Sequence, residues 1–112
     1  MSTVINCKKD NLKKLGYKDL EDCLKDTNNV YIGRHCAYVK GANQSIFANK
    51  FSINNYGRDK CLELYEQYLR NNDVLMKEIL KLKGKQLLCW CKPERCHGDI
   101  IIKILNELDN KL

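Results

Sequence analysis

Three cysteines and a histidine lie within nine residues in the last third of the chain. Cys89, Cys91 and Cys96 are followed directly by His97. Thiolates and imidazoles are ligands that zinc prefers. A site using all four would distort the backbone, because Cys89 and Cys91 share one face of a predicted strand whereas neighbours such as Cys96 and His97 diverge. The spacing therefore favours Cys91, Cys96 and His97 as zinc ligands, with an open position or a ligand borrowed from elsewhere.

The same segment also suits thiol or acid–base chemistry. Cys96 and His97 stand at the start of a predicted helix, where free N–H groups and the helix dipole favour anions and lower a thiol pKa. Asp99, in the first turn, either caps this helix or orients His97. Cys96, His97 and Asp99 are therefore the candidate catalytic residues. Cys89 lies in an apolar strand, and we expect it in the core.

A cationic segment precedes this cluster by several tens of residues. Residues 27–58 contain no carboxylate, and residues 30–60 hold five cations against the single acid Asp59. Such a segment suits an anionic ligand or a nucleic-acid backbone. We expect the cations to bind phosphate, Asn49 to hydrogen-bond a base or sugar, and aromatic rings to stack on it. The candidate ligand-binding residues are Gly33, Arg34, Asn49, Lys50, Phe51, Arg58, Trp90 and Gly98.

The hydrophobic pattern predicts a small α/β domain. Its order is (β)αβ–loop–αα–β–α, with a short, mainly parallel sheet flanked by helices. The expected strands cover residues 3–7, 30–32 and 86–90, and the expected helices cover residues 17–25, 58–70, 74–82 and 98–110. Residues 34–56 are predicted to be irregular, and a loop of that length is usually functional. We expect one domain over residues 1–112, with an N-terminal extension at 1–28 that carries one helix and a core at 29–108.

The predicted topology brings the two unusual segments together. Strands joined through helices run parallel with a right-handed crossover, so their carboxyl ends meet at one edge of the sheet. Arg34 follows one strand and Cys91 follows another. Ligands bind at this edge in α/β folds. The sequence therefore predicts a single site there.

Composition limits the class of protein. The chain has 112 residues, 44% hydrophobic and 30% charged, which fits one globular domain and excludes a disordered chain. No apolar run approaches the roughly 18 residues of a membrane span, and the first residues lack the layout of a signal peptide. We therefore expect a cytoplasmic protein with no membrane partner. In that compartment the seven cysteines are expected to be reduced rather than paired in a disulfide scaffold.

Several motifs together resemble a known family. They are Val30-Tyr31-Ile32-Gly33-Arg34, Ala48-Asn49-Lys50-Phe51, Arg58, Leu82-Lys83-Gly84-Lys85, Cys89-Trp90-Cys91-Lys92-Pro93 and Cys96-His97-Gly98-Asp99. Over residues 29–108 they resemble the domain of unknown function 4326, found in bacteria, phages and large DNA viruses. The family usually has Asn-Pro-Phe where this chain has Asn49-Lys50-Phe51, which relaxes the loop and adds a cation. The resemblance implies a shared site without a reaction, and in a viral protein it implies the host cytoplasm.

Two function hypotheses follow. In the first, the protein binds a phosphate-bearing nucleotide or nucleoside derivative and hydrolyses or transfers part of it. In the second, it is a non-enzymatic, zinc-stabilised module that binds nucleic acid or a protein. The sequence leaves the ligand, the reaction and the oligomeric state open.

Overall fold

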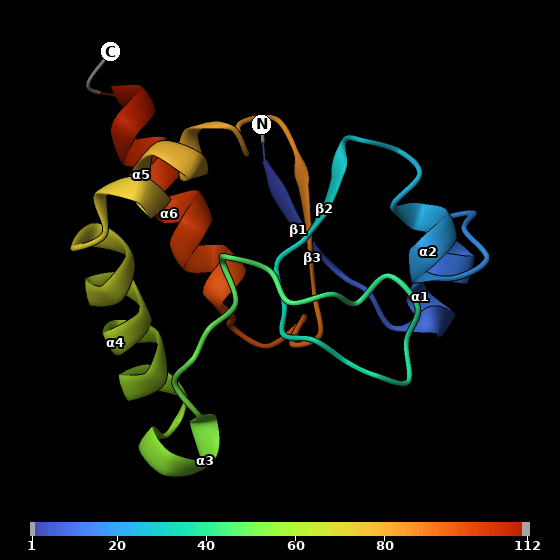
Figure 1. Cartoon of the computed structure of the whole chain (residues 1–112), viewed down its shortest axis with the longest axis horizontal. Helices are drawn as coiled ribbons and strands as arrows, with labels where there is room; N and C mark the ends of the chain where they lie inside the picture. The colour runs from blue at the N-terminus through green and yellow to red at the C-terminus, as the bar shows by residue number, and fades with distance from the viewer. Residues whose placement is uncertain (1, 111–112) are drawn as a thin grey trace.

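A three-stranded parallel sheet forms the centre of the protein (Figure 1). The computed structural model describes residues 2–110, with strands β1 (Thr3–Asn6), β2 (Asn29–Tyr31) and β3 (Gln86–Cys89). The strand order is β1-β3-β2, and both outer strands run parallel to β3. The central strand is also the most apolar, with Leu87, Leu88 and Cys89 fully buried. The predicted parallel α/β fold is confirmed.

Residues 2–110 form six helices beside the sheet, and polar side chains cap some of them. Asn72 caps one helix by accepting a hydrogen bond from the backbone of Leu75, and Asp19 caps another in the same way through Asp22. The helices are α1 (Lys9–Lys14), α2 (Leu20–Cys23), α3 (Ile53–Tyr56), α4 (Arg58–Arg70), α5 (Asp73–Leu80) and α6 (His97–Asn110). The short helices α1 and α3 were not predicted, because neither is long enough to show an apolar period. The helix expected over 17–25 is confined to α2.

Side-chain alternation along β3 divides the core into two layers. Leu87 and Cys89 pack with α4, α5 and α6, whereas Leu88 packs with α1, α2 and Tyr31. Figure 1 shows α4, α5 and α6 on one side of the sheet and α1 and α2 on the other. The sheet is therefore buried on both faces, as parallel sheets require.

The N-terminal segment is part of this architecture. The sequence predicted an extension over 1–28 with a strand over 3–7 and one helix. The strand is confirmed as β1, at the edge of the sheet, and the segment contains a second helix, α1. Beyond β1, the backbone N–H of Cys7 donates to the carbonyl of Cys89 at 2.8 Å, which prolongs the pairing. Within residues 2–110, no helix is both long and apolar enough to cross a membrane.

The long connection between β2 and α3 is irregular, as predicted, but it is held at several points. The buried hydroxyl of Tyr65 on α4 donates to the carbonyl of Phe47 at 2.5 Å. The backbone N–H of Ser45 donates to the carbonyl of Gly33 at 3.1 Å. These contacts hold the connection across the carboxyl edge of the sheet, where the predicted site lies.

Candidate functional site

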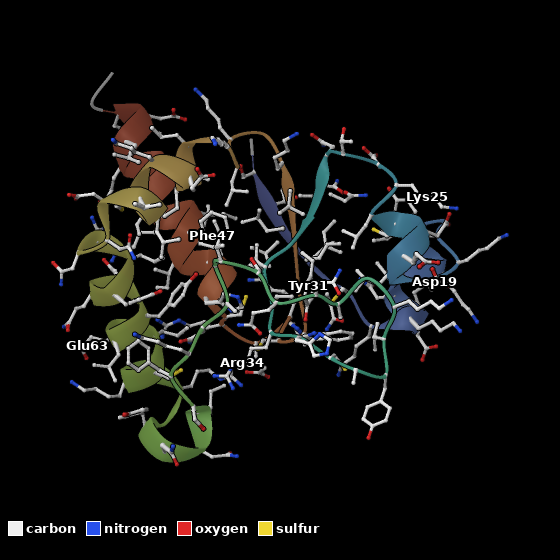
Figure 2. The ribbon with its side chains drawn as sticks, in the orientation of Figure 1. Asp19, Lys25, Tyr31, Arg34, Phe47 and Glu63 are labelled. Atoms are coloured by element: carbon white, nitrogen blue, oxygen red, sulfur yellow. The ribbon has the colours of Figure 1, made fainter. Side chains whose placement is uncertain are left out.

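A cavity of about 600 Å³ opens at the carboxyl edge of the sheet. Its walls come from the connection after β2, the beginning of α4 and the turn between β3 and α6. Figure 2 shows Arg34 near this end of the sheet, on the side where α3 lies. Eight of the predicted site residues line it: Arg34, Asn49, Phe51, Arg58, Trp90, Cys91, Cys96 and His97. The topology thus brings together residues that are up to 63 positions apart in the sequence.

Three arginines line the cavity, and no carboxylate in the described part of the chain does so. Arg34 donates from Nε to the carbonyl of Asn49 at 2.7 Å and from Nη2 to that of Phe51 at 3.2 Å. Arg58 donates from Nη1 to the carbonyl of Arg95 at 2.6 Å. Each guanidinium has five N–H donors, so both arginines hold the walls and keep donors to spare.

Arg95 is exposed, and its ion pair lies at the surface. Its Nη1 lies 3.0 Å from Oδ1 of Asp59, and the side chains are 65% and 90% exposed. An exposed pair of this kind contributes little stability. The positive charge of Arg95 is therefore only weakly neutralised by other groups of the protein.

Two predicted ligand-binding side chains already have partners. Asn49 accepts a hydrogen bond from the backbone N–H of Phe51 at 2.9 Å and donates to the sulfur of Cys61 at 3.1 Å. Trp90 donates from Nε1 to the hydroxyl of Tyr31 at 2.8 Å. These hydrogen bonds fix the orientation of both side chains in the wall.

His97 is nearly buried, and its hydrogen bond fixes which ring nitrogen is protonated. Nε2 lies 2.7 Å from the carbonyl oxygen of Ile32, which can only accept, so Nε2 carries the hydrogen. The ring meets Tyr65 edge to face at a centroid distance of 5.2 Å. Burial lowers the pKa of His97, so the neutral ring is favoured. Nδ1 then carries a lone pair and can accept a hydrogen or a proton.

Cys89 and Cys96 form a buried thiol pair with their sulfurs 3.1 Å apart. The hydrogen bond from the Cys96 thiol lowers the pKa of Cys89 to about 6, despite burial. The same contact, together with burial, raises the pKa of Cys96. The expectation of a lowered thiol pKa at Cys96 was therefore wrong, because the pair places the negative charge on Cys89. Cys89 lies in the core, as predicted.

Four predicted site residues lie outside the cavity wall. A Cβ on Gly33 would lie 2.5 Å from the hydroxyl of Tyr31, and one on Gly98 would lie 2.9 Å from Cγ2 of Val4. These glycines thus permit close packing. The other two are Lys50 and Asp99.

The charged groups of Lys50 and Asp99 both interact with other groups of the protein. The ammonium of Lys50 lies 4.2 Å from the ring centroid of Tyr68, within cation–π range. Asp99 accepts a hydrogen bond from the backbone N–H of Cys96 at 3.0 Å and pairs with Lys92 at 2.5 Å. Asp99 therefore caps α6, which was one of its two predicted roles.

The zinc hypothesis finds no preformed site. Across residues 2–110, no group of three or more His, Cys, Asp or Glu side chains is arranged to hold a metal ion. Zinc binding by Cys91, Cys96 and His97 stays a prediction, which elemental analysis of the purified protein tests.

Sequence reasoning missed several residues of the wall. Arg95 lies in the turn directly before Cys96. Its position next to the Cys96-His97-Gly98-Asp99 motif is a signal from which it could have been predicted as a site residue. Cys36 and Cys61 were not among the predicted site residues, and both line the cavity. Cys61 stands in the first turn of α4, where only the folded connection shows that it faces a ligand-sized space.

Comparisons with known proteins agree with the resemblance in the motifs. The family described as Domain of unknown function (DUF4326) matches residues 17–107, and so begins earlier than the expected boundary at 29. The chain is 30% identical over 95 residues to an uncharacterized 12.4 kDa protein of Enterobacteria phage T4, encoded in the nrdA-td intergenic region. The alignment covers 73% of this chain and 88% of that protein. No solved structure matches.

Proposed function

The chain belongs to the DUF4326 family, and from that premise we propose that it binds a phosphate-bearing nucleotide or nucleoside derivative in the cavity at the carboxyl edge of its sheet. The observation that carries this proposal is the charge of the wall. Arg34, Arg58 and Arg95 line the cavity without a carboxylate among the described lining residues. Guanidinium groups bind phosphate through paired, charge-assisted hydrogen bonds.

The size and remaining chemistry of the cavity support a nucleotide-sized ligand. A volume of about 600 Å³ falls within the usual range for small-molecule sites. Trp90 and Phe51 offer aromatic surface for a base. His97 offers an acceptor at Nδ1 for a hydroxyl or amino group of the ligand. Phosphate, base and sugar thus each have a candidate partner.

A chemical step would depend on His97. As a neutral imidazole with Nδ1 unprotonated, it is in the state that a general base requires. Cys96, the next candidate for chemistry, reaches the same cavity. Hydrolysis or group transfer on the bound ligand is therefore the reaction class that we propose to test after binding, by chromatography of nucleotides incubated with the protein.

The binding test is a thermal-shift and calorimetric titration with nucleoside mono-, di- and triphosphates. The matching nucleosides without phosphate serve as ligand controls. We expect at least one nucleotide to raise the melting temperature and its nucleoside to have a weaker effect.

Arginine variants locate the binding. Arg95→Ala removes only an exposed ion pair, so the fold should be retained, while nucleotide affinity should fall about tenfold or more. Arg34→Ala should abolish the nucleotide-dependent stabilisation. The matched control is Arg70→Ala at the far end of α4, roughly 18 Å along the helix from Arg58, which removes the same charge and should leave affinity unchanged. No stabilisation by any nucleotide, or equal losses in all three variants, would contradict the proposal.

A further inference from the structure

We infer that Cys89 and Cys96 form a redox-active dithiol that is oxidised to an intramolecular disulfide by a small organic disulfide entering through the cavity. The inference is independent of nucleotide binding. It rests on the positions of two sulfur atoms and on the presence of Cys96, but not Cys89, in the cavity wall.

The first observation is the distance. The two sulfurs lie 3.1 Å apart, and no other sulfur–sulfur hydrogen bond is found in residues 2–110. A disulfide requires about 2.05 Å, so the sulfurs must approach by roughly 1 Å, which small side-chain rotations can supply. The seven cysteines are free in the structure. This pair is the one that geometry prepares for bond formation.

The second observation is the rigidity of the backbone around the pair. Cys89 ends β3, and its carbonyl accepts a hydrogen bond from Cys7 at 2.8 Å. Cys96 immediately precedes α6, and its backbone N–H donates to Asp99 at 3.0 Å. Two independent elements therefore hold the sulfurs in contact, and the pairing does not depend on a chance loop conformation.

The third observation is the asymmetry of access. Cys96, although only 2% exposed, lines the cavity, whereas Cys89 is fully buried and outside the wall. A reagent in the cavity therefore meets Cys96 first. Cys96 is then the attacking thiol, and Cys89 is the resolving thiol.

The reaction balances as two thiol–disulfide exchanges. The proton that the pair shares moves from Cys96 to Cys89 across their hydrogen bond, and the Cys96 thiolate attacks one sulfur of R–S–S–R, forming the mixed disulfide Cys96–S–S–R and releasing R–S⁻. The sulfur of Cys89 then attacks the Cys96 sulfur and releases the second R–S⁻. The one proton of the dithiol monoanion passes from Cys89 to the first leaving thiolate, and solvent protonates the second. The protein loses two electrons, and the organic disulfide is reduced to two R–SH molecules.

The test uses the full-length reduced protein and bis(2-hydroxyethyl) disulfide, a small neutral probe. After alkylation of the remaining thiols, trypsin separates the cysteines, because it cleaves after Lys85, Arg95 and Lys103 but not before Pro93. Cys89 and Cys91 fall on the peptide of residues 86–95, and Cys96 falls on the peptide of residues 96–103. We expect most of the second peptide to be recovered linked to the first.

Three variants assign the link. Cys89→Ser should lose the linked pair at least tenfold and retain the probe on Cys96 as an adduct of about 76 Da, because the resolving thiol is gone. Cys96→Ser should lose both the link and that adduct. Cys91→Ser is the matched control on the same peptide, and it should form the link as the wild type does.

Two results would overturn the inference. One is an unlinked 96–103 peptide in the wild-type protein after exposure to the probe. The other is a link that disappears in Cys91→Ser and persists in Cys89→Ser. An unlinked wild-type peptide overturns the inference without any substitution, and Cys91→Ser, which changes a half-buried cysteine, separates the two possible links even where Cys89→Ser fails to fold.

Discussion

Nε2 of His97 lies 2.7 Å from the carbonyl oxygen of Ile32, and this bond joins the start of α6 to the residue that follows β2. These positions are 65 residues apart in the chain. The bond fixes the tautomer of the imidazole, and it satisfies a buried carbonyl that β3 does not reach. It therefore contributes both to stability and to the chemistry available in the cavity.

Replacing His97 separates these contributions. His97→Ala should lower the free energy of unfolding by about 2–4 kcal/mol, because it leaves a cavity beside Tyr65 and deprives the Ile32 carbonyl of its donor. His97→Gln, whose amide can reach the same carbonyl, should lose clearly less. Urea denaturation measures both. Equal losses for the two variants would contradict the structural importance of the hydrogen bond.

His97 should also make stability depend on pH. Burial lowers its pKa below the ordinary value of about 6.5, so in the interval below that value the unfolded chain binds a proton that the folded protein does not. The stabilisation is complete above about pH 6.5 and is lost as pH falls toward the folded-state pKa. Denaturation between about pH 5 and pH 7.5 should show a steeper decline for wild type than for His97→Gln. Cys89 titrates in both proteins, so the difference between the two curves isolates the histidine.

Gly98 should not tolerate even one added methyl group. A Cβ there would lie 2.9 Å from Val4 and 3.0 Å from Ile32, whose side chains pack between α6 and the sheet. Gly98→Ala should therefore cost about 1–2 kcal/mol of stability, outweighing the better helix propensity of alanine. The control is Asn106→Ala, at an exposed position of the same helix, which should be neutral or slightly stabilising. A Gly98→Ala protein with wild-type thermal stability would show that this contact relaxes freely.

Tyr65 should hold the connection that forms part of the cavity wall. Its buried hydroxyl donates to the carbonyl of Phe47 at 2.5 Å, so Tyr65→Phe should lower stability by about 1–2 kcal/mol. Tryptic cleavage after Lys50 should also become faster, because the connection loses an anchor. Tyr68→Phe on the same helix keeps the ring beneath Lys50 and serves as the control. Unchanged cleavage in Tyr65→Phe would mean that other contacts suffice to hold the connection.

The pattern of apolar residues predicted the elements that carry the core. The run ending at Cys89 has the continuous apolar character of a strand buried on both faces, and α4, α5 and α6 show helical spacing over eight or more residues. The helices α1 and α3 could not be found in the same way. Each has six residues or fewer, and α3 buries none of them.

The location of the site could be predicted because chain topology alone brings its segments together. Parallel strands bring Arg34 and Cys91 to one edge, whatever the loops do. The role of an individual side chain depends on its partners, which the sequence does not name. Lys50 lies over an aromatic ring, and Gly33 makes room for Tyr31, so neither lines the cavity.

The sequence by itself determined the fold class, the parallel sheet and the edge at which the unusual residues gather, because hydrophobic periodicity and crossover geometry are local and topological properties. Only the tertiary structure decided which groups touch. It placed Cys96 against Cys89 and paired His97 with Ile32. It also brought Arg95 into the cavity wall and left Asp99 as a cap. Hydrogen bonds and sulfur contacts form only within a few ångströms, and packing of distant segments sets distances on that scale.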